Sequence, residues 1–226
     1  MQNKELVQNK LYMKLFNFFK TWKTKQKVKS LRKKLKLEID QNISGSQESI
    51  DQISKVLTDF KKHNYSKHDS FLNLCIFSDI VLIDLTLLLE KFQFAERLQE
   101  KKLYARVISI VLLDYLDNIG VLIGSNCLAE LKRNNMLEFI DEFKSMHKNF
   151  SSFKTTNERL LREIRNNTIA HKNKDALILN QHINKLNENE IYEFGLQFKI
   201  HIKDFIDLST KVINYISEYM REGRKI

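Results

Sequence analysis

Residues 71–94 have the sequence FLNLCIFSDIVLIDLTLLLEKFQF, and this apolar stretch sets the class of fold. Residues 103–123, LYARVISIVLLDYLDNIGVLI, form a second stretch of the same kind. A helix that is apolar on most of its surface has to be buried on most sides. Two aspartates interrupt each stretch, which argues against a membrane span in either place. We therefore predict two long central helices of a helical bundle.

Turn residues are scarce in this chain, which has no proline and five glycines among its 226 residues. A β-rich fold would need more of both, so helices with short polar connections are favoured. We predict an all-α protein whose residues 46–226 form an up-and-down helical bundle. Residues 1–45 are predicted to be a basic, amphipathic N-terminal helical extension followed by a linker. The linker is expected at residues 41–46, QNISGS, where polar residues and a glycine cluster.

Local signals predict where further helices begin. A serine or threonine followed three residues later by an acidic residue is a capping box, and residues 66–69 (SKHD) and 155–158 (TTNE) have this form. Residues 187–190, NENE, indicate the start of the last long helix. Besides the two central helices, the predicted elements are helices at 46–62 and 126–148, a helix starting at 155–158, a short helix or turn at 176–185, and a helix from 187 to about 221.

The net charge of +10 belongs to the first 38 residues. They hold 12 Lys or Arg and two acidic residues, whereas the rest of the chain carries 26 basic and 26 acidic side chains. Apolar residues recur between these lysines at helical spacing: Leu11, Leu15, Phe18, Phe19 and Trp22. Three interpretations stand side by side. The segment is a helix docked on the bundle, an arm that binds nucleic acid through phosphates and stacking, or a helix on an anionic membrane.

Candidate metal ligands are few. Cys75 and Cys127 lie among apolar residues, and we expect them to be reduced, buried thiols of a cytoplasmic protein. No CxxC or HExxH spacing occurs, so a zinc site has no support, and we expect neither a metal nor a cofactor. The aspartates of the two apolar stretches are expected to act as caps, partners of Lys or Arg, or dimer contacts; they are Asp79, Asp84, Asp114 and Asp117.

The strongest candidate for a functional segment is residues 160–171, LLREIRNNTIAH. Its apolar positions predict a helix, but residues 166–168 are weak helix formers, so the helix is expected to loosen there. At about 100° per residue, the side chains of Arg165 and His171 differ by about 120° in direction, and on one straight helix they do not meet. They can act on one substrate if the helix end is distorted or if a second chain completes the site.

The pattern Arg165-Asn166, three residues, Ala170-His171 resembles the HEPN signature, which is an arginine, four to six intervening residues and a histidine. The form seen here is closest to the abortive-infection-type branch. The resemblance implies an all-helical bundle, usually dimeric, that is often a metal-independent endoribonuclease of phage-defence or toxin–antitoxin systems. Many toxin members carry a tyrosine two residues after the histidine, where this chain has Asn173.

The resemblance assigns catalysis to Arg165 and His171, and the chemistry of RNA cleavage suits these residue types. RNA supplies its own nucleophile, the 2′-OH. An imidazole can move the protons near neutral pH, and a guanidinium can stabilise charge on the phosphate in the transition state. Asn166, Lys172 and Lys174 are predicted to bind the substrate.

The expected partners are RNA, a second copy of the chain, and an antitoxin or other defence-system protein; membrane contact through the arm stays open. The alternative function is a non-catalytic HEPN-like helical module that binds RNA or a partner protein. A purely structural role is a further alternative, in which Arg165 forms a surface ion pair with Glu158 or Asp175. In the catalytic interpretation, Asp79 or Asp84 is a candidate to orient Arg165.

Overall fold

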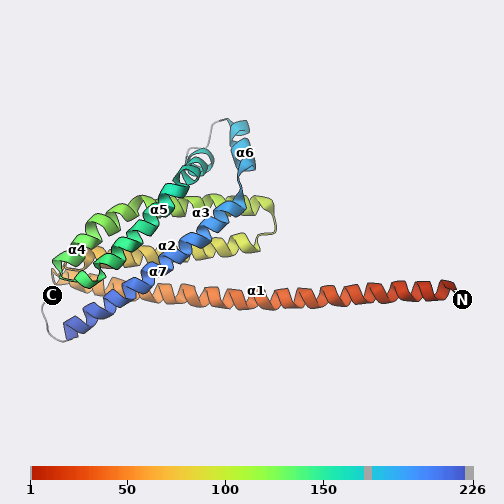
Figure 1. The fold of residues 1–226 in the computed structure, drawn as a ribbon, viewed down its shortest axis with the longest axis horizontal. Coiled ribbons are helices and arrows are strands. Elements are labelled where there is room, and N and C mark those ends of the chain that lie inside the picture. Colours follow the sequence, from red (N-terminus) through yellow and green to blue (C-terminus); the bar gives the residue numbers. More distant parts are fainter. Residues whose placement is uncertain (1, 171–174, 222–226) are drawn as a thin grey trace. The chain divides into compact units, whose positions relative to one another are not determined.

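The computed structural model describes residues 2–170 and 175–221, apart from the side chains of residues 2–25, 28 and 170. Every regular element in this part of the chain is a helix, which confirms the all-α prediction (Figure 1). The elements are α1 (Gln2–Lys62), α2 (Asp69–Phe94), α3 (Leu98–Ile119), the π-helix η1 (Gly120–Cys127), α4 (Leu128–Arg133), the 3₁₀ helix η2 (Leu137–Phe139), α5 (Ile140–Arg165), the π-helix η3 (Asn166–Ala170), α6 (Ala176–Lys185) and α7 (Glu188–Arg221). The chain divides into two units, residues 1–44 and 45–226.

The predicted basic extension is helical and forms the first part of α1. The prediction that a linker interrupts the helix at residues 41–46 is wrong, because α1 continues through these residues to Lys62. Gly45 lowers the helix propensity by about 1 kcal/mol, which is not enough to interrupt a long helix. Beyond it, the Ser49 hydroxyl donates a hydrogen bond to Asp79 Oδ2 (2.8 Å) and links α1 to α2. The predicted apolar stripe of the arm consists of side chains outside the described residues: Leu11, Leu15, Phe18, Phe19 and Trp22.

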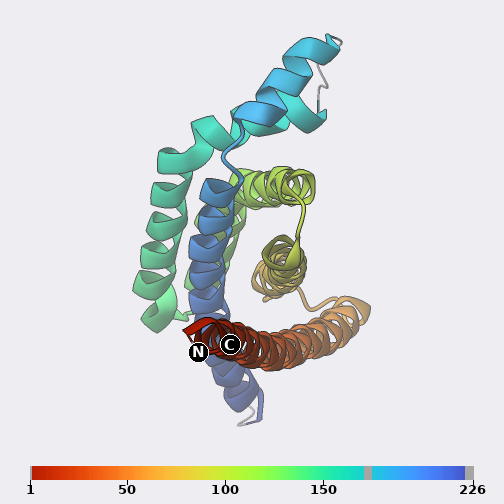
Figure 2. The same cartoon turned by 90° about the vertical axis from the view of Figure 1, so that its right-hand side faces the viewer.

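In the 45–226 unit, α2, α3, α5 and α7 pack side by side around an aromatic core (Figures 1 and 2). Tyr115, near the C-terminal end of α3, is fully buried. Its ring lies 5.3 Å from the rings of Phe77, Phe150 and Phe198, one from each of the other three helices. Its hydroxyl forms a hydrogen bond with the Ser78 hydroxyl (3.0 Å), so the one polar atom of this ring is satisfied.

The prediction of two long central helices is confirmed by α2 and α3, which supply much of the core. Among the described residues, Asp69–Phe94 and Leu98–Arg133 have the length and hydropathy of membrane-crossing helices. About half of the most apolar part of each is buried within the bundle, as in core helices of helical proteins. The predicted state of Cys75 and Cys127 is also confirmed, since both are free, buried thiols.

A glycine allows α7 to approach its neighbours closely. A Cβ atom at Gly195 would lie 2.9 Å from Leu89 of α2 and 3.3 Å from Ile108 of α3. After Gly195, α7 buries large residues of the predicted stripe, including Phe198, Ile202, Phe205, Leu208 and Val212. The predicted start of this helix is also confirmed, because the Asn187 side chain accepts the N–H of Glu190 (3.3 Å).

The helix boundaries predicted between residues 126 and 165 are wrong. Instead of a helix at 126–148 and a new one starting at 155–158, α4 ends at Arg133 and α5 runs unbroken from Ile140 to Arg165. Thr155 therefore lies inside a helix, and its hydroxyl donates to the carbonyl of Ser151 (2.9 Å) instead of capping. The continuous buried face of α5 outweighs the local cap signal; it comprises Ile140, Phe143, Met146, Phe150, Phe153, Asn157, Leu161 and Ile164.

The start of α2 is capped by a residue from a distant part of the chain. The helix begins near the predicted capping box at residues 66–69, but no side chain from that box caps it. Instead, the buried carboxylate of Glu130 on α4 accepts the N–H groups of Ser70 (2.8 Å) and Phe71 (2.9 Å). Burial raises the pKa of Glu130, and these two hydrogen bonds oppose the rise. A carboxylate at a helix N-terminus also interacts favourably with the helix dipole.

Replacing this distant cap should be costly. We expect Glu130→Ala to lower the free energy of unfolding by about 3 kcal/mol, because two buried N–H groups lose a charged acceptor. Denaturant unfolding of the variant and of the wild type measures the difference. Glu138→Ala is the matched control: Glu138 is exposed on η2, and its removal should change the stability by less than about 0.5 kcal/mol. Equal effects of the two substitutions would contradict the role given to Glu130.

Candidate functional site

The candidate segment lies where a regular helix changes its winding. Arg165 is the last residue of α5, and Asn166–Ala170 form the π-helix η3. The predicted loosening of the helix is thus confirmed for these five residues. The Thr168 hydroxyl donates to the carbonyl of Ile164 (2.6 Å), a side-chain contact that competes with regular helical hydrogen bonding. Single π-helical turns are frequent at functional sites.

Two basic side chains of α3 hold η3 and α6 in place. Arg106 Nη1 donates to the carbonyl of Thr168 in η3 (3.4 Å), and burial lowers the pKa of Arg106. Lys102 is buried, and its Nζ donates to the carbonyls of Ile183 (3.0 Å) and Asn184 (2.8 Å) in the last turn of α6. The carbonyls at a helix end need such partners. The segments before and after residues 171–174 are therefore both fixed to α3.

The structure brings two of the predicted site residues together. Arg165 Nε donates to the side-chain oxygen of Asn166 (3.3 Å), so these neighbours are in contact. The predicted catalytic residue His171 and the predicted substrate-binding residues Lys172 and Lys174 lie outside the described residues.

Arg165 belongs to a charged cluster that joins α5 to α3. Lys154, Glu158, Arg162 and Arg165 follow one another at helical spacing on one face of α5. Asp117 of α3 faces them: its Oδ1 accepts from Arg162 Nη2 (2.6 Å) and Lys154 Nζ (3.0 Å), and its Oδ2 lies 4.0 Å from Arg165 Nη1. Arg162 Nε also donates to Glu158 (2.6 Å). Three cations and two anions give this set, the Arg165 cluster, a net charge of +1.

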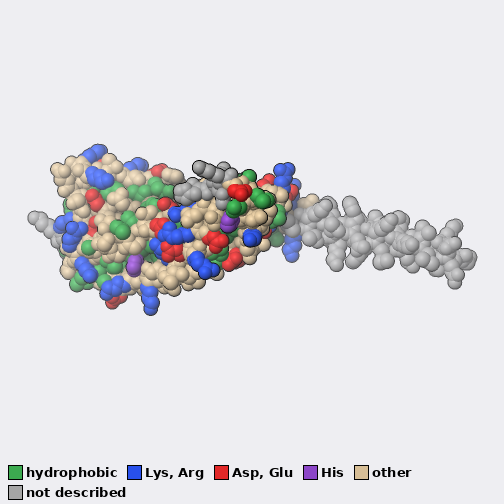
Figure 3. Space-filling view, turned by 90° about the horizontal axis from the view of Figure 1, so that it is seen from above, with side chains coloured by type: hydrophobic (Ala, Val, Ile, Leu, Met, Phe, Trp, Pro, Cys, Tyr) green, Lys and Arg blue, Asp and Glu red, His purple; other side chains and the backbone are tan. Residues whose placement is uncertain are grey.

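The Arg165 cluster is open to solvent, with the Arg165 and Asp117 side chains 32% and 33% exposed. Basic and acidic side chains are interspersed over one face of the 45–226 unit (Figure 3). Burial opposes ionisation of Asp117, but hydrogen bonds from Lys154 and Arg162 outweigh it and lower the pKa of the carboxyl. The hydrogen bond to Glu158 is the main cause of the raised pKa of Arg162. Asp117 and Arg162 therefore stay charged at neutral pH.

The carboxylate beside Arg165 differs from every one predicted. Asp79 or Asp84 was expected to orient Arg165, but Asp117 holds that place, so this prediction is wrong. Asp79 instead accepts the Ser49 hydroxyl, and burial raises its pKa. Asp84 is exposed on α2. The expectation that such aspartates act as interhelical partners of Lys or Arg is confirmed at Asp117, but no sequence signal distinguished it from the other three.

A small cavity lies on another side of η3, between this element, α6 and the start of α7. Its volume is about 130 Å³, and its lining includes Glu163, Thr168, His182, Lys185 and Glu190. Since a water molecule occupies about 30 Å³ of liquid, the cavity holds a few waters but no nucleotide. No sequence pattern groups these titratable side chains, because α6 and α7 bring them to α5 only in the folded chain.

Within the described ranges, no group of three His, Cys, Asp or Glu side chains could hold a metal ion. The Arg165 cluster offers guanidinium and ammonium groups, which are the usual partners of phosphate and carboxylate. What the geometry defines is thus a partly exposed cationic site at a helix end in an all-α bundle. No protein-family model, curated protein or solved structure matches this chain.

We predict that the net charge of the Arg165 cluster affects the affinity for RNA. Asp117→Asn should raise its net charge from +1 to +2 and tighten binding of a short single-stranded RNA at low salt, an effect that fades above about 0.5 M salt. The unfolding free energy should fall by less than about 1 kcal/mol, because partly exposed ion pairs contribute little. Fluorescence anisotropy at several salt concentrations measures the binding.

The matched control is Asp84→Asn on α2. Asp84 is exposed, so this substitution changes the total charge equally, outside the Arg165 cluster. An identical gain in RNA affinity from both variants would mean that the cluster is not where RNA binds.

Proposed function

We propose that this protein is a metal-independent endoribonuclease of the HEPN type, acting in a phage-defence or toxin–antitoxin system. The observation that carries the proposal is the position of Arg165. It ends α5 where the helix turns into η3, partly exposed and in contact with both Asn166 and Asp117. The arginine of the HEPN-like motif therefore sits where a phosphate can reach it, with its guanidinium held in place.

In this proposal, the chemistry needs only side chains and the 2′-OH of the substrate. His171 takes the proton of the 2′-OH or delivers one to the departing 5′ oxygen, as an imidazole can near neutral pH. Arg165 stabilises the negative charge that builds up on the phosphorus centre. Asn166 and Asp117 orient Arg165, and Arg162 and Lys154 add positive charge beside it. Lys172 and Lys174 are proposed to bind the RNA backbone.

A non-catalytic HEPN-like module that binds RNA or a partner protein is the second candidate. Two observations favour it. The contacts of Arg165 with Asp117 and Asn166 also suit a purely structural ion-pair network that joins α3 to α5. The cavity beside η3, at about 130 Å³, is too small for a nucleotide. The two candidates differ in whether His171 is required for RNA cleavage.

The proposed enzyme is a homodimer with one composite cleft. A twofold axis lets the same patch of two chains supply both Arg165 and His171, whatever their directions within one chain. The end of α3 next to Asp117 supports this arrangement, because Asp114 and Asn118 are exposed and Val121 in η1 is 58% exposed. Polar residues suit the rim of an interface, and an exposed apolar residue suits its centre.

The central test is RNA cleavage in the presence of excess EDTA. Single-stranded RNA should be cut, leaving 2′,3′-cyclic phosphate ends, while DNA of the same sequence stays intact because it lacks the 2′-OH. Arg165→Ala and His171→Ala should each lower the rate by at least about 10²-fold. Mass spectrometry of the products identifies the ends. Full RNA-binding affinity with no cleavage in wild type would reject the enzyme and favour the non-catalytic module; cleavage restored only by added metal would reject the mechanism.

The shared cleft is tested by mixing two inactive variants. Arg165→Ala and His171→Ala chains, unfolded together and refolded, form mixed dimers that retain one Arg165 and one His171 on different chains. Activity should return in the mixture if the two groups act across the dimer axis, and each variant refolded alone serves as the control. A chain that sediments as a monomer and still cleaves RNA would rule out the composite cleft.

A further inference from the structure

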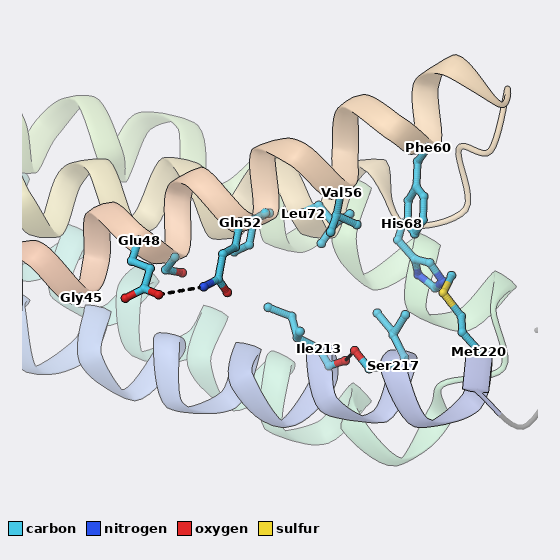
Figure 4. Close-up of a pocket in the computed structure, with 13 residues that line it drawn as sticks. Gly45, Glu48, Gln52, Val56, Phe60, His68, Leu72, Ile213, Ser217 and Met220 are labelled. Atoms are coloured by element: carbon cyan, nitrogen blue, oxygen red, sulfur yellow. Dashed lines mark hydrogen bonds between the residues drawn. The ribbon is translucent and has the colours of Figure 1, made fainter.

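A second candidate site lies far from the Arg165 cluster in sequence, in a groove between the last part of α1 and the end of α7. Its volume is about 600 Å³, within the range of small-molecule sites. Most of its lining is apolar and includes Ile53, Val56, Phe60, Leu72, Ile213 and Met220. Gly45 and Glu48 mark one end of the groove, and Phe60, His68 and Met220 mark the other (Figure 4).

His68 provides one buried polar group at that second end. The side chain is only 1% exposed, and its Nε2 has no hydrogen-bond partner in the part of the chain that the structure describes. The Asn134 amide nitrogen donates to the carbonyl of Lys67, and the same nitrogen lies 3.3 Å from His68 Nδ1. Because that nitrogen can only donate, Nδ1 accepts, and the ring proton is on Nε2. A buried N–H group without an acceptor is unfavourable, so a bound acceptor would stabilise it.

The protonation of His68 is set by its surroundings. Burial lowers the pKa of His68 to about 4; the Lys67 charge adds to this effect and the Asp69 charge opposes it. The ring is therefore neutral at pH 7 and presents a single N–H donor. Glu48 is the one charged side chain among the described residues that line the groove, at the end away from His68, where it accepts a hydrogen bond from Gln52 (3.1 Å). An anionic ligand would meet this carboxylate and no cation of the described lining, so an uncharged ligand fits the groove better.

We propose that the groove binds an uncharged, elongated apolar molecule whose carbonyl oxygen accepts a hydrogen bond from His68 Nε2. In this proposal the carbonyl lies at the end marked by Phe60 and Met220. The apolar tail runs between Val56 of α1 and Ile213 of α7, which lie on opposite sides of the groove (Figure 4). The site is separate from the proposed ribonuclease chemistry, because it uses α1, α2 and α7 instead of α3, α5 and η3.

The test uses 2-decanone as the probe and decanoate as its charged counterpart, with the full chain at pH 8. Both compete with the neutral fluorescent dye N-phenyl-1-naphthylamine, whose emission rises in apolar sites. The dye should bind, 2-decanone should displace it, and decanoate should need at least about a tenfold higher concentration, a difference of about 1.4 kcal/mol. Absence of dye binding to the wild type, or equal displacement by decanoate, would overturn the proposal.

Two variants locate the site. Val56→Trp fills the groove from a position that is 43% exposed, so the fold should tolerate it, and the dye and 2-decanone should both bind at least about tenfold more weakly. Ile200→Trp is the matched control, because Ile200 is 61% exposed on α7 and is not part of the groove lining; it should change neither affinity. Equal effects of the two substitutions would place the binding elsewhere and reject the proposal.

The role of His68 is tested with His68→Phe, which keeps a flat ring and removes the N–H donor. The affinity for 2-decanone should fall about tenfold, while the dye, which has no carbonyl, should bind as before. Circular dichroism checks that the variant is folded. If it is not, the Val56→Trp and decanoate results decide on their own. Unchanged 2-decanone binding by a folded His68→Phe protein would remove the hydrogen bond from the proposal and overturn it.

Discussion

The packing of α3 against α2, α5 and α7 is the constraint on which the rest of the 45–226 unit depends. Tyr115 fills the space between the four helices, and its hydroxyl is satisfied by Ser78. With α3 fixed in this way, its polar side chains bind other elements and hold them in place. Lys102 binds the end of α6, Arg106 binds η3, and Asp117 binds the cations of α5. The helix α3 thus positions α5, η3 and α6, the elements around the proposed ribonuclease site.

Two helix ends in the described part of this protein are satisfied by residues from other helices. Glu130 of α4 caps the start of α2, and Lys102 of α3 binds the end of α6. Such contacts tie helices together as well as satisfying backbone groups, because the donor and acceptor belong to distant segments. Local caps occur where the chain leaves a loop, as at Asp175 before α6 and Asn187 before α7.

The two proposed sites use different physical means. At the Arg165 cluster, charged groups face solvent, so their effect on phosphate depends on charge balance and ionic strength. In the groove between α1 and α7, the proposed ligand is bound mostly by apolar contacts. One hydrogen bond from the neutral N–H of His68 fixes the orientation of the ligand. Because no described residue contributes to both sites, a change in one can be studied with the other intact.

The sequence by itself determined the helical class, the two central helices, the buried thiols and the loosening of the chain after Arg165. These follow from properties of single segments, namely apolar content, helical periodicity, the lack of proline and the weak helix propensity of residues 166–168. It predicted a linker at 41–46, where α1 continues because one glycine lowers helix propensity by only about 1 kcal/mol. It also predicted a helix start at 155–158, where the continuous buried face of α5 outweighs a local cap signal of about the same size. Only the tertiary structure decided that Glu130 caps α2, that Asp117 rather than Asp79 or Asp84 faces Arg165, and that His68 reaches a groove with a free N–H. Each of these depends on which helices pack together and in what rotation, and no pattern within a single segment specifies that.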